Sequence, residues 1–139
     1  EGRIHQIDSP IELLENPKTL FVSSFILGNN IFRLKREDNS YSCCLGEINN
    51  FFIRDKKNIK FISISPKFIF IERSKDGKAV IVSKEFLGEY FIYKIFLNGE
   101  TIRVRTNINK SFNIGDNCIL SFAKDSFFFA YPGAYKVFI

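Results

Sequence analysis

Short apolar segments separated by turn residues run through most of this chain and predict a mainly β fold. Segments of about four to eight residues rich in Ile, Val, Phe and Tyr are typical of strands, and Asn, Asp, Gly and Ser between them are typical of turns. A succession of short strands spaced about 8–12 residues apart indicates a small barrel or sandwich. The expected strands are 31–34, 41–45, 48–54, 59–64, 68–72, 79–87, 90–97, 101–106, 118–122 and 127–131.

Two dipeptides predict tight hairpins. Asn98-Gly99 is the stronger, because both central positions of a type I′ turn need positive φ, and Asp76-Gly77 is the second. After Asn98-Gly99, Ile102 and Val104 alternate with arginines, which predicts a strand with one buried face.

A faint repeat suggests that one hairpin occurs twice. The segment 62–71 resembles the segment 120–129, which lies 58 residues further along. We therefore expect two hairpin-rich halves, about 29–73 and 79–133. They would form either two barrels of the oligonucleotide/oligosaccharide-binding (OB) type or one barrel with a partner sheet. The expected class is mainly β and OB-like.

The composition limits the type of protein. At 139 residues with 17 Phe, the chain can form one domain or two small barrels sharing a core. It has no apolar run near the roughly 20 residues that span a bilayer. The cysteines, Cys43, Cys44 and Cys118, do not suggest a disulfide framework, which favours a reduced, cytoplasmic protein. The net charge of +5 suits nucleic acid or an anionic membrane surface, but a Phe-, Ile-, Asn- and Lys-rich coding bias also explains it.

The first 28 residues have a helical pattern instead. Ser9 and Glu12 have the spacing of a capping box, and Pro10 stands at the first helical position, where its missing N–H costs nothing. Pro17 ends the helix, because the residue before a proline is disfavoured in the helical region. We expect residues 1–28 to form a helical linker and 29–139 a β domain.

The same segment reads Gly2-Arg3-Ile4-His5-Gln6-Ile7-Asp8-Ser9-Pro10-Ile11-Glu12-Leu13-Leu14-Glu15-Asn16-Pro17, then Phe21-Val22-Ser23-Ser24-Phe25-Ile26. It resembles the segment by which ATPase subunits of ABC importers leave their nucleotide-binding domain. The family pattern is Gly-x-Ile-x-Gln-x-Gly-x-Pro-x-Glu-Ile-Tyr-x-x-Pro and then Phe-Val-Ala-x-Phe-Ile-Gly. Asp8 and Leu27 depart from it. The resemblance implies that the chain is the rear part of a larger protein.

The region from about 80 to 132 resembles the TOBE domain at the rear of such ATPases. Gly88 and Gly115 are expected to serve backbone turns, and Asp116 to shape a turn rather than act as a catalytic acid. Ser65-Pro66-Lys67 stands where sugar- and polyamine-type members have Arg-Pro-Glu, so only the proline matches. The matching elements are Phe86-Leu87-Gly88, 90–97, Asn98-Gly99, 101–105, Ile114-Gly115-Asp116 and Phe127-Phe128-Phe129. The segments closest to ferric iron importer ATPases are Cys43-Cys44-Leu45-Gly46 and Phe129-Ala130-Tyr131-Pro132-Gly133.

The resemblance implies a regulatory and dimerisation domain. In the family, the rear barrels meet across the ATPase dimer at the cytoplasmic face of the bacterial inner membrane and in some members bind an inhibitory ligand or protein. The partners would be a second copy of the subunit, the permease through the ATPase domain, and a small-anion effector. ATP and Mg²⁺ would bind the ATPase domain, not this chain. The interface candidates lie on aromatic strands that could equally be core: Tyr90, Tyr93, Phe129 and Tyr131.

The sequence lacks the motifs that would indicate an ATP site, a metal site or a Ser-His-Asp triad. It has no Gly-x-x-x-x-Gly-Lys-Ser/Thr phosphate loop, and His5 is its only histidine, so it suggests no ATP site, no metal site and no Ser-His-Asp triad. The main alternative is an OB-type module for single-stranded nucleic acid, and a third is a small-anion sensor like the molybdate-binding barrels related to TOBE. The basic residues that the nucleic-acid alternative would use are Arg33, Lys35, Arg36, Arg54, Lys56, Lys57, Arg103 and Arg105.

Overall fold

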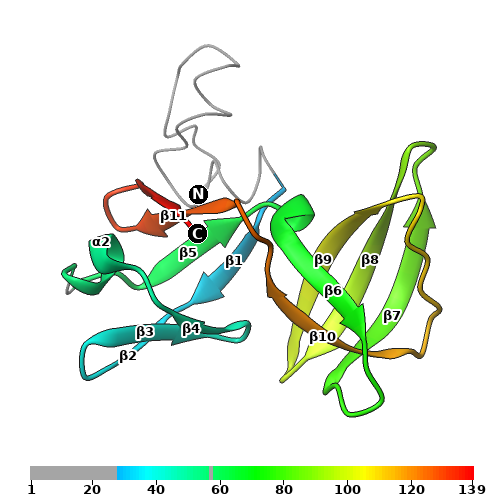
Figure 1. Ribbon diagram of the computed structural model, residues 1–139, viewed down its shortest axis with the longest axis horizontal. Helices are drawn as coiled ribbons and strands as arrows, with labels where there is room; N and C mark the ends of the chain where they lie inside the picture. The colour runs from blue at the N-terminus through cyan, green and yellow to red at the C-terminus, as the bar shows by residue number, and fades with distance from the viewer. Residues whose placement is uncertain (1–27, 57) are drawn as a thin grey trace, which may run out of the picture. The chain divides into compact units, whose positions relative to one another are not determined.

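A computed structural model describes residues 28–56 and 58–139 of the chain, and in this part the fold is mainly β, as predicted (Figure 1). Within the described residues, twelve strands form three antiparallel sheets. They divide into two compact units: residues 28–65 with Asp125–Ile139, and Pro66–Lys124. The second unit is thus an insertion into the sequence of the first, and the units do not correspond to the expected halves 29–73 and 79–133. The helix expected within residues 1–28 lies outside the described residues.

The first unit contains a four-stranded sheet, a three-stranded sheet and a short helix. The four strands, in sheet order, are β1 (Asn30–Arg33), β5 (Phe61–Ile64), β11 (Phe127–Tyr131) and β12 (Tyr135–Phe138). The smaller sheet comprises β2 (Lys35–Glu37), β3 (Ser40–Cys43) and β4 (Gly46–Ile48), and the helix is α2 (Phe51–Arg54). Buried Tyr41 of β3 links the smaller sheet to the segment after α2, because its hydroxyl donates to the carbonyl of Lys56.

The second unit is one five-stranded sheet preceded by a short 3₁₀ turn, η2 (Pro66–Phe68). Its strands, in sheet order, are β6 (Ile69–Arg73), β10 (Asn117–Phe122), β7 (Ala79–Phe86), β8 (Tyr90–Leu97) and β9 (Glu100–Asn107). Although β6 and β9 are the two edges of this sheet, β9 lies close to both η2 and β6. The sheet therefore curls on itself (Figure 1). No strand pairing joins β6 to β9 in the described structure, so no closed barrel is found there, and the OB-like class stays a prediction.

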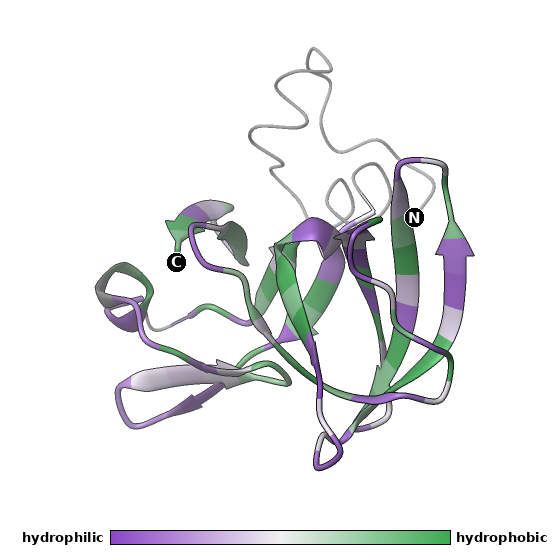
Figure 2. Ribbon diagram, turned by 45° about the vertical axis from the view of Figure 1, so that its right-hand side comes forward, coloured by the Kyte–Doolittle hydropathy of each residue, from purple (hydrophilic) through white to green (hydrophobic). Residues whose placement is uncertain are grey.

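Alternating side chains give the curled sheet an apolar inner face. Along β9, Ile102, Val104 and Thr106 are buried, whereas Arg103 and Arg105 are exposed. Figure 2 shows this alternation as bands of hydrophobic and hydrophilic residues along the strands of the second unit. The predicted two-faced strand after Asn98-Gly99 is confirmed, because successive side chains of a strand point to opposite faces.

The expected strand over 48–54 is wrong. β4 ends at Ile48, and Phe51–Arg54 form helix α2. Asn50 stops the strand, because its side-chain oxygen accepts from the N–H groups of Phe52 (2.9 Å) and Ile53 (3.3 Å) and so caps the helix.

The Asp76-Gly77 hairpin and the repeated hairpin are wrong too. A turn does follow β6, but β6 and β7 are not neighbours, because β10 lies between them and pairs with both. In the repeat, β5 and β6 belong to different sheets, as do β10 and β11. Instead, β5 pairs with β11 and β6 pairs with β10. The repeated segments are therefore the two connections by which the chain passes from the first unit to the second and back.

Candidate functional site

The most distinctive surface feature of the second unit is a groove of about 360 Å³ at the open seam of its sheet. One side comes from η2 and β6, and the other from the adjoining ends of β8 and β9 and the loop that follows β9. Its lining combines cations, aromatic rings and apolar side chains. The lining residues are Lys67, Ile69, Phe70, Ile71, Glu89, Tyr90, Arg105, Thr106, Asn107, Lys110 and Ala123.

Strand register brings Arg105 and Tyr90 together on the outer face of β8 and β9. The Asn98-Gly99 turn, with φ values of 50° and 82°, pairs Leu97 with Glu100, and the ladder then pairs Tyr90 with Asn107. Because Arg105 is two residues from Asn107, it is the diagonal neighbour of Tyr90 on the same face. The carbon at the centre of its guanidinium lies 3.7 Å from the Tyr90 ring centroid, which is a close cation–π contact.

A second cation–aromatic pair crosses the groove. The Lys110 ammonium, from the loop after β9, lies 4.4 Å from the ring centroid of Phe70 on β6. Phe70 keeps 42% of its surface exposed, whereas Ile69 and Ile71 on either side of it are buried. The Phe70 ring therefore remains partly open to a ligand.

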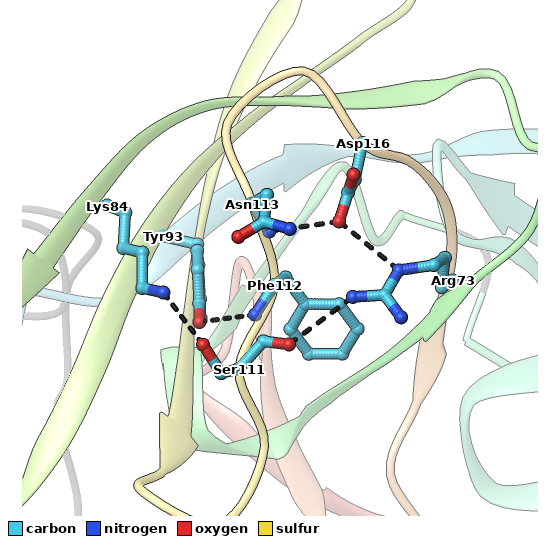
Figure 3. A network of polar contacts seen from close by, with 7 residues as sticks. All are labelled: Arg73, Lys84, Tyr93, Ser111, Phe112, Asn113 and Asp116. Carbon is cyan, nitrogen blue, oxygen red and sulfur yellow. Dashed lines mark hydrogen bonds and ion pairs between the residues drawn. The ribbon is translucent and has the colours of Figure 1, made fainter.

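The loop that carries Lys110 is held by its own packing. The Lys110 N–H donates to the carbonyl of Asn107 (3.2 Å). Further on, Phe112 is buried, its N–H donates to the Tyr93 hydroxyl (2.9 Å), and the two rings meet edge to face with centroids 5.6 Å apart. The hydroxyl of buried Tyr93 thus has a hydrogen-bond partner, and Tyr93 anchors this loop (Figure 3).

Asp116 fastens the far end of the same loop. Its carboxylate accepts from the Asn113 N–H (2.9 Å) and from Arg73 Nε (3.2 Å) (Figure 3). The Asn113 N–H above all, and then the Arg73 guanidinium, hold the pKa of this carboxyl below its usual value despite partial burial. Ser111 adds two contacts, because its hydroxyl accepts from Lys84 Nζ (2.8 Å) and its carbonyl from Arg73 (3.4 Å). Asp116 therefore holds the end of this loop through these hydrogen bonds.

The charge of the groove favours anions. Three cations, Lys67, Arg105 and Lys110, line it against one carboxylate, Glu89. The apolar walls concentrate the resulting field, because a low-dielectric surface screens charge less than water does. Chemically, the groove can bind an anionic group beside a planar ring.

The interface and structural candidates from the sequence lie at different places. Gly88, Asn98, Gly99 and Gly115 all have positive φ at turns of the second unit, from 50° to 95°. Tyr93, Phe129 and Tyr131 are 4% exposed or less, so they are core residues of their own units. Of the named aromatics, only half-buried Tyr90 contributes to the groove.

Sequence reasoning missed most of the groove. It named Tyr90 as an interface residue and Arg105 as part of a scattered basic set, without joining them. Phe70 and Lys110 carried no signal, because they are 40 residues apart and meet only when β9 curls towards β6. Lys67 departs from the family triplet Arg-Pro-Glu, and nothing else in the sequence marks it as a binding residue.

The described residues contain no group of three or more His, Cys, Asp or Glu placed to bind a metal ion. Nor does any helix in that part of the chain have the length and apolarity needed to cross a bilayer.

A scan against models of protein families and a search of curated proteins both gave no match.

Proposed function

We propose that this chain is a non-catalytic accessory domain of the ATPase subunit of a bacterial ABC importer, with ferric iron as its cargo. Polyamines, sugars and anions are the other cargo classes. The observation that carries the proposal is the order of Gly, Ile, Gln, Pro, Glu and Pro within residues 2–17, followed by Phe-Val-x-x-Phe-Ile. The mainly β fold supports it, as do positive φ values at Gly88, Gly99 and Gly115, three glycines of the TOBE-like pattern.

In this role the domain acts without chemistry of its own. It would tether two ATPase subunits at the cytoplasmic face of the inner membrane and raise their effective concentration between ATP cycles. A ligand or protein that favours one arrangement of the domain would shift the balance between open and closed dimers. The permease would be reached only through the ATPase domain.

The coding region upstream of Glu1 tests this proposal. The expected result is a phosphate loop, a Leu-Ser-Gly-Gly-Gln-type signature and an acidic Walker B strand. The matching functional test removes residues 28–139 from that longer protein and measures dimerisation and ATP hydrolysis. We expect a weaker dimer with an intact ATP site. An upstream region that lacks all three motifs overturns the proposal.

A second function is favoured by a basic stripe on the outer face of β8 and β9. Lys94 pairs with Arg103, and Arg105 follows on the same face, beside exposed Phe96 and half-buried Tyr90. Cations interleaved with aromatic rings are the elements of a single-stranded nucleic-acid site. This function predicts that a labelled oligodeoxythymidine of about 20 nucleotides binds with strong salt dependence. It also predicts that Arg103→Ala and Arg105→Ala weaken binding alike.

A further inference from the structure

We propose that the groove between β6 and β9 binds a small organic phosphate of mononucleotide size. Arg105 and Lys110 bind the phosphate, and the planar part of the ligand packs on Phe70. The proposal goes beyond the accessory function and does not depend on it, because it uses only the geometry of the second unit.

The state of Arg105 is the first argument. Among the described residues, no side chain forms an ion pair or hydrogen bond with its guanidinium. Among these residues its cation–π partner is the Tyr90 ring, and the 3.7 Å between the guanidinium carbon and the ring centroid fits stacking of the ring on the guanidinium plane. Stacking therefore orients the guanidinium plane while leaving its N–H edges for another acceptor. A planar fork of N–H donors suits the oxygens of a phosphate.

The Phe70–Lys110 pair is the second argument. An exposed aromatic ring with an ammonium 4.4 Å from its centroid offers an apolar surface and a positive charge at one place. A ligand that carries both a flat ring and a phosphate ester can place the ring on Phe70 and the phosphate at Lys110. A bare inorganic anion would use the charge and leave the ring exposed to water.

Size and charge favour one small molecule over a polymer. A volume of about 360 Å³ is near the lower end of the range for small-molecule sites, about 300–1,000 Å³. Arg103 and Lys94 continue the basic stripe along β9 and β8, but neither lines the groove. The Glu89 carboxylate does line it and would repel a longer polyphosphate.

Calorimetric titration of the 139-residue chain tests the proposal, with adenosine 5′-monophosphate and uridine 5′-monophosphate as probes. We expect saturable binding of at least one nucleotide, with adenosine, uridine and inorganic phosphate binding at least about tenfold more weakly. Arg105→Ala should raise the Kd by about tenfold or more, since it removes charged hydrogen bonds. Arg105→Lys should lie in between, because it keeps the charge and loses the fork.

Arg103→Ala is the matched control, because it removes the same charge from the same strand outside the groove. We expect the Kd of this variant to stay within about twofold of the parent value, because dissolved salt screens the attraction between the ligand and a surface charge outside the site. Phe70→Leu should weaken nucleotide binding but leave phosphate binding unchanged. Circular dichroism and melting of each variant separate loss of the site from loss of the fold.

Three results would overturn the proposal. The first is the absence of saturable binding by either nucleotide. The second is equal binding of nucleoside and nucleotide, which would exclude a phosphate site. The third is tighter binding of a 20-nucleotide oligodeoxythymidine together with equal losses in Arg103→Ala and Arg105→Ala, which would show a nucleic-acid stripe instead. None of these results bears on the upstream ATPase motifs, so the two proposals fail independently.

Discussion

Gly77 is buried against the backbone of β10, so replacing it with alanine tests the strand order of the second unit directly. An alanine Cβ at this position would lie 2.2 Å from the carbonyl oxygen of Cys118 and 2.5 Å from its carbonyl carbon. Ordinary van der Waals contact begins near 3.4 Å, so one of the two backbones must move by more than 1 Å.

Neither backbone can move freely. Cys118 pairs with Arg73 on one side and Ala79 on the other, and Asn117 donates from its side chain to the Gly77 carbonyl (3.1 Å). Overpacking costs about 1–3 kcal/mol, and each disturbed backbone hydrogen bond adds about 1 kcal/mol. We therefore expect Gly77→Ala to lower the free energy of unfolding by about 3 kcal/mol, and the melting temperature by about 10 °C.

The assay is urea unfolding followed by circular dichroism, with Gly99→Ala as the control. Position 99 is open to solvent and has φ of +82°, so alanine there costs only backbone strain, about 1 kcal/mol. An unstrained Gly→Ala change elsewhere usually stabilises a protein by about 0.4–1 kcal/mol. A Gly77→Ala variant as stable as the parent, or more stable, would refute the close approach to β10.

Three further perturbations test the turn, the loop and the core of the second unit. Gly99→Val should lower the free energy of unfolding by about 1–3 kcal/mol, because a β-branched residue resists positive φ. An unchanged midpoint of urea unfolding would contradict the Asn98-Gly99 turn. The fold lowers the pKa of the Asp116 carboxyl, so the ionised carboxylate stabilises the protein above the ordinary carboxyl pKa, and this stabilisation is lost as pH falls through the folded value. Asp116→Asn should therefore flatten the acid side of the curve of unfolding free energy against pH. A variant curve that runs parallel to the parent curve would contradict this role of Asp116. Burial, with the Asp116 charge adding to it, raises the pKa of Cys118 to about 11, so stability should fall as pH rises from about 9 to 11, and Cys118→Ala should abolish this fall. In the native protein near pH 8, Cys118 should resist iodoacetamide until unfolding, whereas rapid labelling would show that β10 is not core.

Elements with local causes could be predicted from the sequence. The strands at 90–97 and 101–106 and the turn between them follow from alternation and from two residues that accept positive φ. Asp116 was predicted to shape a turn because an aspartate beside a glycine bonds its own backbone, and it accepts from Asn113. The helix at Phe51–Arg54, where the apolar run 48–54 predicts a strand, also has a local cause, the capping side chain of Asn50.

Pairing between strands that are distant in the sequence decided the strand order of the second unit and the groove. The sequence by itself determined a mainly β chain and its tightest turn, because φ preferences and side-chain alternation act over a few residues. Only the tertiary structure placed β10 between β6 and β7, since Cys118 and Leu120 of the 117–122 segment are buried there, far along the chain from β6. The same curling of the sheet brought Phe70 to Lys110 and left a groove with Arg105 at its rim. No local pattern encodes this groove, because its two sides meet only through the curvature of the whole sheet.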